Sequence, residues 1–307
     1  MSGTTFDVIA IGAGPAGEVL AGRLADKGYD VAIVESELVG GECSYYACMP
    51  SKALLRPAQA LAGRGVDVRT GVRAAAVRRD GGVVTLTLSD GREVRGWEIL
   101  VATGRRPLTQ DLGLETVGLR PGAVIGVDNR LAVPGLPWLY AIGDVNGRSL
   151  LTHMGKYQAH VLSEILDGHV AAVSGDDVTA PRVIFTDPQV AAAGLTLQAA
   201  LDRGVEARAY DVPSSGTAGA AFHGNGTPGT ARIIVDERRG VLVGATFTGT
   251  EVADWLQAAT IAIVSKTPVE LLWQAVPPFP TRSEIWLKLL ERREADLPRE
   301  RAAKAAA

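Results

Sequence analysis

Short apolar runs and one amphipathic stretch open the chain. Residues 6–11 and 30–35 are mostly apolar, a composition typical of buried parallel strands. Between them, residues 16–27 have the pattern of a helix, and a second helix is expected over residues 47–62. Residues 65–70 predict a third strand. This order of elements is typical of an α/β fold with a parallel sheet.

The pattern changes to alternation of apolar and polar positions between residues 74 and 95. Such alternation is typical of antiparallel strands, and Asp90-Gly91 is a favoured pair for the tight turn between two of them. The segment therefore predicts a β-meander. After it we expect buried strands over 99–103 and 138–142, a Gly- and Pro-rich connection over 105–136 and a helix over 152–166.

A second region with an α+β pattern begins near Pro181. Its expected elements are strands over 183–185, 232–235 and 241–247 and helices over 251–265 and 282–293. We predict two domains, residues 1–175 and residues 180–293, followed by a tail over residues 294–307.

The composition excludes several classes of partner. The 307 residues are 47% hydrophobic, which is enough to supply two cores. The net charge of −3 shows no basic bias, so neither nucleic acid nor an anionic membrane is expected as a partner. No apolar run has the length of a membrane span and the first residues lack a signal-peptide pattern, so we expect a cytoplasmic protein.

A glycine loop follows the first predicted strand. Gly12, Gly14 and Gly17 fit G-x-G-x-x-G between a strand and a helix, where the glycines allow a tight turn, the approach of a pyrophosphate and close helix packing. Glu35 ends the next strand, where an acid can bind ribose hydroxyls. A purely structural turn is the alternative, and the surrounding elements favour a dinucleotide site. The second match, at residues 224–229, precedes a strand and is interpreted as a hairpin turn.

Both cysteines of the chain, Cys43 and Cys48, lie shortly after this unit. Cytosolic disulfides are usually catalytic or redox-active, so a thiol pair beside a nucleotide site suggests electron transfer. Two inert cysteines are the alternative. The pair alone has too few ligands for a structural zinc ion, and no metal site is predicted.

Further motifs carry a resemblance to a known family. They are Gly40-Gly-Glu-Cys-x4-Cys-Met-Pro-Ser-Lys52, Ala102-Thr-Gly-Arg-Arg-Pro107, Tyr140-Ala-Ile-Gly-Asp144 and Phe185-Thr-Asp-Pro188. Together with the glycine loop they closely resemble the pyridine nucleotide–disulfide oxidoreductases, and the dihydrolipoamide dehydrogenase-like members most.

The resemblance implies a cofactor and roles for individual residues. FAD would bind at the glycine loop, with Gly143 and Asp144 near its ribityl–pyrophosphate region. Cys48 would lie nearest the flavin, Cys43 would exchange with the substrate, and Lys52 would lie near the flavin N5. The family also implies a homodimer formed through the C-terminal interface domain.

Two features depart from the family pattern. Phe279 stands where the family has the histidine of His-Pro-Thr-x-x-Glu, so the general acid/base of thiol–disulfide exchange is missing, although Glu284 is present. The chain also has one credible glycine loop where the family has two, one for FAD and one for NAD(P)H. Residues 1–62 and 121–175 resemble the FAD domain, whereas 63–120 resemble the end of the NAD(P)H domain. We therefore predict a single hybrid FAD-type, Rossmann-like domain with a β-meander, followed by an α+β interface domain.

Three functions compete. The leading hypothesis is an FAD-dependent oxidoreductase that moves electrons between flavin and a Cys43–Cys48 disulfide, with a small-molecule donor or acceptor. NAD(P)H serves this role in the family, but its glycine loop is missing here. The first alternative is a flavin-binding or dimerising remnant without turnover. A plain NAD-dependent dehydrogenase is the third, and it leaves the thiols unexplained.

Overall fold

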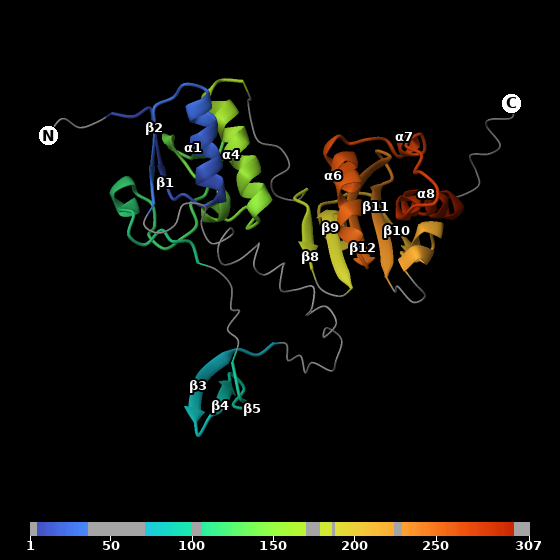
Figure 1. Cartoon of the computed structure of the whole chain (residues 1–307), viewed down its shortest axis with the longest axis horizontal. Coiled ribbons are helices and arrows are strands. Elements are labelled where there is room, and N and C mark those ends of the chain that lie inside the picture. The colour runs from blue at the N-terminus through green and yellow to red at the C-terminus, as the bar shows by residue number, and fades with distance from the viewer. Residues whose placement is uncertain are drawn as a thin grey trace. The chain divides into compact units, whose positions relative to one another are not determined.

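The fold was analysed in a computed structural model of the chain (Figure 1). The structure describes residues 5–35, 71–99, 106–169, 179–185, 188–223 and 229–297. Within them, residues 71–99 and 106–123 form one compact unit and the rest form another. The strands expected over 65–70 and 99–103 and the helix expected over 47–62 lie largely or wholly outside the described residues.

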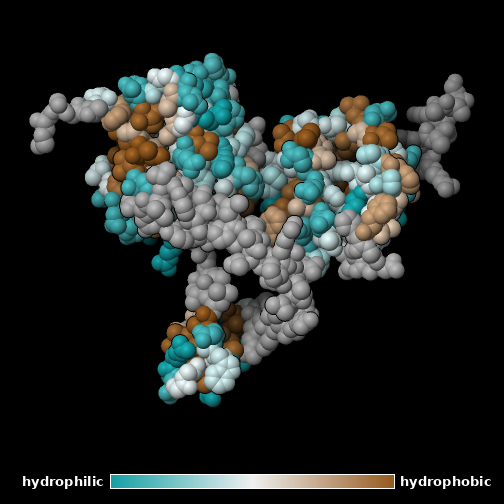
Figure 2. All heavy atoms as spheres, in the orientation of Figure 1, coloured by the Kyte–Doolittle hydropathy of each residue, from teal (hydrophilic) through white to brown (hydrophobic). Residues whose placement is uncertain are grey.

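The N-terminal strand–helix–strand unit is confirmed. Strand β1 (Val8–Ile11), helix α1 (Pro15–Asp26) and strand β2 (Val31–Val34) follow in order. The two strands pair in parallel, with Ile9 opposite Ala32 and Ile11 opposite Val34. These side chains share one face of the pair, and Figure 2 shows hydrophobic surface over β1 and β2. Ile9 and Ile11 are 63% and 68% exposed, so the described residues leave this face uncovered.

The region around residue 140 differs in part from the prediction. Strand β7 (Leu136–Tyr140) pairs antiparallel with β6 (Ala132–Val133), and it ends two residues earlier than expected. It ends there because Ala141 makes local hydrogen bonds instead, donating its N–H to the carbonyl of Leu131 and accepting from the side chain of Asn146. The 3-10 turn η2 (Gly143–Asn146) follows, and helix α4 (Thr152–Leu166) has the predicted bounds.

Helices α1 and α4 pack against each other in the N-terminal part of the structure (Figure 1). Leu20 and Leu24 of α1 and Leu162 and Ile165 of α4 are buried in one hydrophobic cluster with Leu131. Burying apolar side chains between the helices stabilises this pairing.

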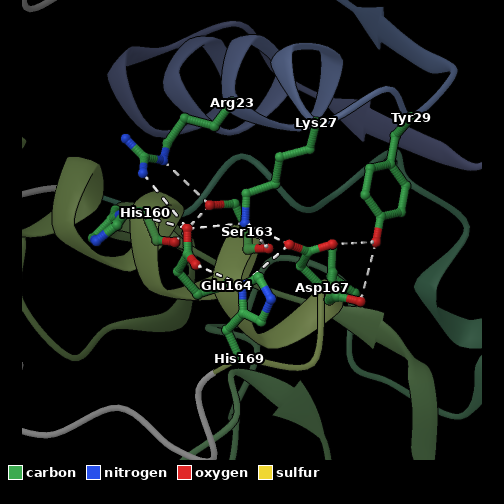
Figure 3. A network of polar contacts seen from close by, with 9 residues as sticks. Arg23, Lys27, Tyr29, His160, Ser163, Glu164, Asp167 and His169 are labelled. Carbon is green, nitrogen blue, oxygen red and sulfur yellow. Dashed lines mark hydrogen bonds and ion pairs between the residues drawn. The ribbon is translucent and has the colours of Figure 1, made fainter.

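A polar network joins the C-terminal ends of the same two helices (Figure 3). The Lys27 ammonium lies 2.9 Å from a Glu164 oxygen and 3.1 Å from an Asp167 oxygen. Arg23 Nε donates to Ser163 Oγ over 3.2 Å. The hydrogen bond between Lys27 and Glu164 raises the pKa of Lys27 and lowers the pKa of Glu164, because it favours the charged form of both groups.

The predicted meander is confirmed in the smaller unit. Strands β3 (Ala74–Asp80), β4 (Val83–Leu88) and β5 (Glu93–Gly96) form a three-stranded antiparallel sheet. In the turn after β4, Gly91 adopts a φ of +83°, a value that glycine adopts without strain. A 3-10 turn, η1 (Leu114–Val117), follows in the long connection.

The C-terminal region contains a five-stranded sheet in the order β10-β11-β12-β9-β8, with antiparallel neighbours. Its strands are β8 (Arg182–Ile184), β9 (Gln189–Gly194), β10 (Ala207–Pro213), β11 (Thr230–Asp236) and β12 (Val241–Gly249). Its helices and 3-10 turns are α5 (Leu197–Asp202), η3 (Ala218–His223), η4 (Val252–Trp255), α6 (Leu256–Val264), α7 (Val269–Leu272), η5 (Arg282–Glu284) and α8 (Ile285–Asp296). Helix α6 packs on β9 and β12, and α8 packs on β10 and β11.

Three details of this region differ from the sequence-based expectations. Strands β9 and β10 and helix α5 were not expected. Each of the two expected helices begins with a 3-10 turn, η4 or η5. Helix α8 continues to Asp296, so the predicted tail begins inside a helix. No helix among the described residues is both long enough and apolar enough to cross a membrane.

Candidate dinucleotide site

The glycine loop forms a tight turn between β1 and α1. The N–H of Gly12 donates to the carbonyl of Val34 over 2.8 Å, which extends the pairing of β1 and β2 into the loop. Gly12 has a φ of +94°, a conformation that side chains other than glycine rarely adopt. Gly14 is extended at the helix N-cap, and Pro15 begins the helix with a φ suited to its first turn.

Each glycine of the motif meets a different spatial requirement. A Cβ atom on Gly17 would lie 2.0 Å from the carbonyl oxygen of Gly12, so only glycine fits where the helix crosses the loop. A Cβ on Gly12 or Gly14 would meet no heavy atom of the described residues within 4 Å. Gly14 is the N-cap of α1, and no side chain in the described part of the chain caps the helix there. N–H groups at such a terminus, with the positive end of the helix dipole, suit a phosphate.

Glu35 lies directly after β2 and reaches the loop. Its Oε2 atom accepts a hydrogen bond from the backbone N–H of Ala13 over 2.7 Å. Glu35, which the sequence predicted to bind ribose hydroxyls, thus lies at the glycine loop. The hydrogen bond to Ala13 was not expected, because a backbone partner leaves no signal in the sequence.

Gly143 and Asp144 come from a distant part of the sequence to the same helix end. A Cβ on Gly143 would lie 3.2 Å from the Cβ of Ala16 in the first turn of α1, and Gly143 has a φ of +77°. Asp144 follows it at the start of η2 and is exposed. The structure therefore brings the six predicted cofactor-binding residues to one end of α1: Gly12, Gly14, Gly17, Glu35, Gly143 and Asp144.

The predicted catalytic residues Cys43, Cys48 and Lys52 lie outside the described residues. Phe279, at the position of the family histidine, is 77% exposed. Glu284 Oε2 is buried and finds no hydrogen-bond partner within the described part of the chain. Among those same residues, no group of His, Cys, Asp and Glu side chains could hold a metal ion.

Two family models match this chain, the first of them in two segments. The family described as pyridine nucleotide-disulphide oxidoreductase matches residues 6–61 and, separately, residues 56–160. Its dimerisation domain matches residues 180–290. The two matches to the first family overlap at residues 56–61.

Curated relatives are similar along most of this chain. The dihydrolipoyl dehydrogenase of Geobacillus stearothermophilus is 31% identical over 293 residues, which cover 92% of this chain and 60% of that protein. The dihydrolipoyl dehydrogenase of Mycobacterium tuberculosis is 32% identical over 283 residues, covering 90% and 59%. These relatives are oxidoreductases, and this chain spans about three fifths of their length.

Solved structures show a similar fold. The crystal structure of LpdA from Mycobacterium tuberculosis is 26% identical, with a TM-score of 0.68 over 94% of this chain and 62% of that one. The HOCl-induced flavoprotein disulfide reductase RclA from Escherichia coli has a TM-score of 0.65 over 94% of this chain and 65% of that one. At 21% identity the second likeness concerns the fold alone.

Proposed function

Because the chain belongs to the pyridine nucleotide–disulphide oxidoreductase family, whose members bind FAD and NAD(P)H, we propose that it binds FAD and passes electrons between the flavin and a Cys43–Cys48 pair. One observation carries the proposal. The glycine loop leaves an open, uncapped helix end, and the Gly143–Asp144 turn packs against the first turn of that helix. The uncapped helix end suits the pyrophosphate of a dinucleotide, and the packed turn brings Asp144 beside that end.

Different residues around this helix end would bind different parts of the cofactor. The first-turn N–H groups of α1 would bind the pyrophosphate, which Gly14 would allow to approach because it has no side chain. Glu35 holds the loop through Ala13, and its carboxylate would bind the ribose hydroxyls. Asp144 would accept hydrogen bonds from hydroxyls of the ribityl region.

Bound FAD supplies two-electron transfer. On the protein side, the Cys43–Cys48 disulfide takes up two electrons and two protons to become a dithiol, and the reverse step releases them. The thiolate is the reactive form, and a lysine such as Lys52 near the thiols favours it. Electrons enter from, or leave to, a small molecule in solution.

Two family features that this chain lacks, a second glycine loop and the C-terminal histidine, limit which small molecules can exchange electrons with it. The chain has a single glycine loop, and the family model matches it in two segments that meet at residues 56–61. Both features favour a chain in which the start of an FAD domain is joined directly to a segment from later in the family sequence. We infer that the nicotinamide site of the family is the missing part. Phe279 cannot transfer a proton, so exchange with a dithiol such as dihydrolipoamide is expected to be slow.

A second candidate function is a flavin-binding, dimerising protein without turnover. It is favoured by the exposed Phe279 and by the unpartnered oxygen of Glu284, since together they leave no acid–base pair at the family position. Both candidates share a homodimer formed through residues 180–290. Ile261, Val264 and Leu271 of this region are exposed apolar side chains suited to such an interface.

Two measurements test these candidates: bound FAD tests the feature they share, and the spectrum of reduced Cys48→Ser tests the flavin–thiol contact that only the first requires. We expect the recombinant chain to be yellow with bound FAD, to be bleached by dithionite, and to resist bleaching by NADH or NADPH. Cys48→Ser should remove any long-wavelength absorbance band of the reduced protein, because that band requires a thiolate next to the flavin. Colourless, flavin-free protein would refute the proposal, and a band that survives in C48S would refute the role of Cys48.

A further inference from the structure

Helix α4 carries a fully buried amide that accepts hydrogen bonds from the turn η2, which holds Asp144 of the proposed flavin site. Gln158 is 0% exposed, and its Oε1 atom accepts two hydrogen bonds. One comes from the backbone N–H of Gly143 over 2.7 Å, and the other from Nδ2 of Asn146 over 2.9 Å. Without an acceptor, a buried N–H costs free energy, so Gln158 stabilises this conformation of the turn.

The orientation of both amides is fixed by backbone groups. The N–H of Gly143 can only donate, so Gln158 must present its oxygen. Asn146 donates from Nδ2 to the carbonyl of Ala141 over 3.0 Å, and its Oδ1 accepts from the N–H of Arg148 over 3.0 Å. The turn is therefore attached to α4 through the backbone N–H of Gly143 and the side-chain amide of Asn146, one on each side of residue 144.

The same turn packs tightly on the helix end where the pyrophosphate is proposed to bind. The Cβ of Ala16 would lie 3.2 Å from a Cβ on Gly143 and 3.3 Å from a Cβ on Gly155 of α4. Ala16 thus fills the space between η2 and α4. A shift of the turn would change the distance between residue 144 and the first turn of α1.

We propose that Gln158 is a positioning residue of the flavin site: by accepting from Gly143 and Asn146, it holds Asp144 where Asp144 binds the cofactor. The proposal rests on FAD binding, the proposed function. It predicts that the contributions of Gln158 and Asp144 to FAD affinity are coupled, because one acts through the other.

A double-mutant cycle on FAD affinity tests this inference. The apo chain is titrated with FAD, and flavin fluorescence gives the dissociation constant. Asp144→Ala should weaken binding about tenfold in the wild-type background and less than about twofold when combined with Gln158→Met. Gln158→Met removes the acceptor at nearly constant volume, whereas Gln158→Glu keeps an oxygen that accepts both N–H groups and should restore most of the affinity.

Ser163→Ala is the matched control on α4. Ser163 is also fully buried, but its hydroxyl accepts from Arg23 at the other end of the helix pair. Its loss should lower the thermal midpoint and leave the FAD dissociation constant unchanged. If the effects of Q158M and D144A on FAD affinity were additive, the positioning role would be overturned. A loss of affinity in S163A as large as that in Q158M would also overturn it. Neither result would contradict the proposed function. No FAD binding by the wild-type chain would overturn both this role and the proposed function.

Discussion

The carboxylate of Glu35 accepts a hydrogen bond from the backbone N–H of Ala13, with 2.7 Å between Oε2 and the nitrogen. Ala13 is the residue between the first two glycines of the loop, and it is fully buried. The residue that follows β2 therefore holds the loop in this conformation. A loop held in its binding conformation loses less entropy when a ligand orders it.

Replacing Glu35 should weaken FAD binding through the loop. Glu35→Ala leaves the N–H of Ala13 without its acceptor, and we expect the FAD dissociation constant to rise about tenfold, in line with a hydrogen bond to a charged group. Glu35→Gln keeps an accepting oxygen and should cost about threefold. Fluorescence titration of the apo chain measures both values, and equal losses in the two variants would contradict this role of the hydrogen bond.

Gly14 and Gly17 should respond differently to replacement by alanine. Gly17→Ala places a Cβ 2.0 Å from a backbone oxygen, so we expect a loss of about 1–3 kcal/mol in the free energy of unfolding as well as loss of FAD. Gly14→Ala meets no atom of the described residues within 4 Å, so it should keep the stability while it blocks the pyrophosphate. Chemical denaturation and FAD titration measure the two effects separately.

Gly22→Ala is the matched control for these variants. Gly22 lies on the exposed side of α1, and a Cβ there also meets no atom within 4 Å in the part of the chain that the structure describes. Alanine is the better helix former, so the free energy of unfolding should rise by about 0.5–1 kcal/mol with FAD affinity unchanged. A stability loss in G14A as large as that in G17A would show that the open side of the loop is not as the structure has it.

The elements that the sequence predicted well are those whose signal is local. Helix α4 has the predicted bounds because an apolar stripe runs through residues 152–166. Strand β9 was missed because Ala191, Ala192 and Ala193 have low strand propensity. They form a strand because β8 and β12 pair with them on both sides and bury them.

The residues of the site also differ in whether the sequence could identify them. The glycines and acids of the proposed flavin site were found because their spacing is a sequence property. Gln158 was not, since a glutamine on an amphipathic helix has no feature that separates it from an exposed one. Its burial depends on the packing of α4 against η2, which is tertiary information.

The ion pair between α1 and α4 should make stability depend on pH. The Lys27 ammonium holds the pKa of Glu164 below its usual value near 4.5, so Glu164 stabilises the fold above that pH and less as the pH falls through its folded pKa. Glu164→Gln should therefore lower the thermal midpoint at pH 7. The gap to wild type should close when the pH falls well below 4.5, as thermal unfolding at several pH values will measure.

The interpretation of this test depends on the other charged neighbours of Glu164 and on a control ion pair elsewhere in the chain. His160 and His169 lie 4.0 and 3.4 Å from the Glu164 carboxylate, so they are further partners of the charge that Glu164→Gln removes. Glu98→Gln removes an exposed partner 3.8 Å from Arg79 and should leave the midpoint unchanged. A gap in E164Q that persists unchanged at pH 3 would show that the charge of Glu164 is not what stabilises the helix pair.

Restoring the family histidine should restore thiol–disulfide exchange if the thiols are competent. Phe279 is exposed and stands at the position of the family histidine, and Glu284 stands at the position of the family glutamate, so Phe279→His completes that motif. We expect dihydrolipoamide to bleach the flavin of F279H at least about 100-fold faster than that of wild type, the usual effect of a positioned acid–base group. Anaerobic stopped-flow absorbance measures the rate without NAD(P)H. The gain should shrink in F279H/E284Q and vanish in F279H/C43S; an equal rate in F279H and wild type would favour the function without turnover.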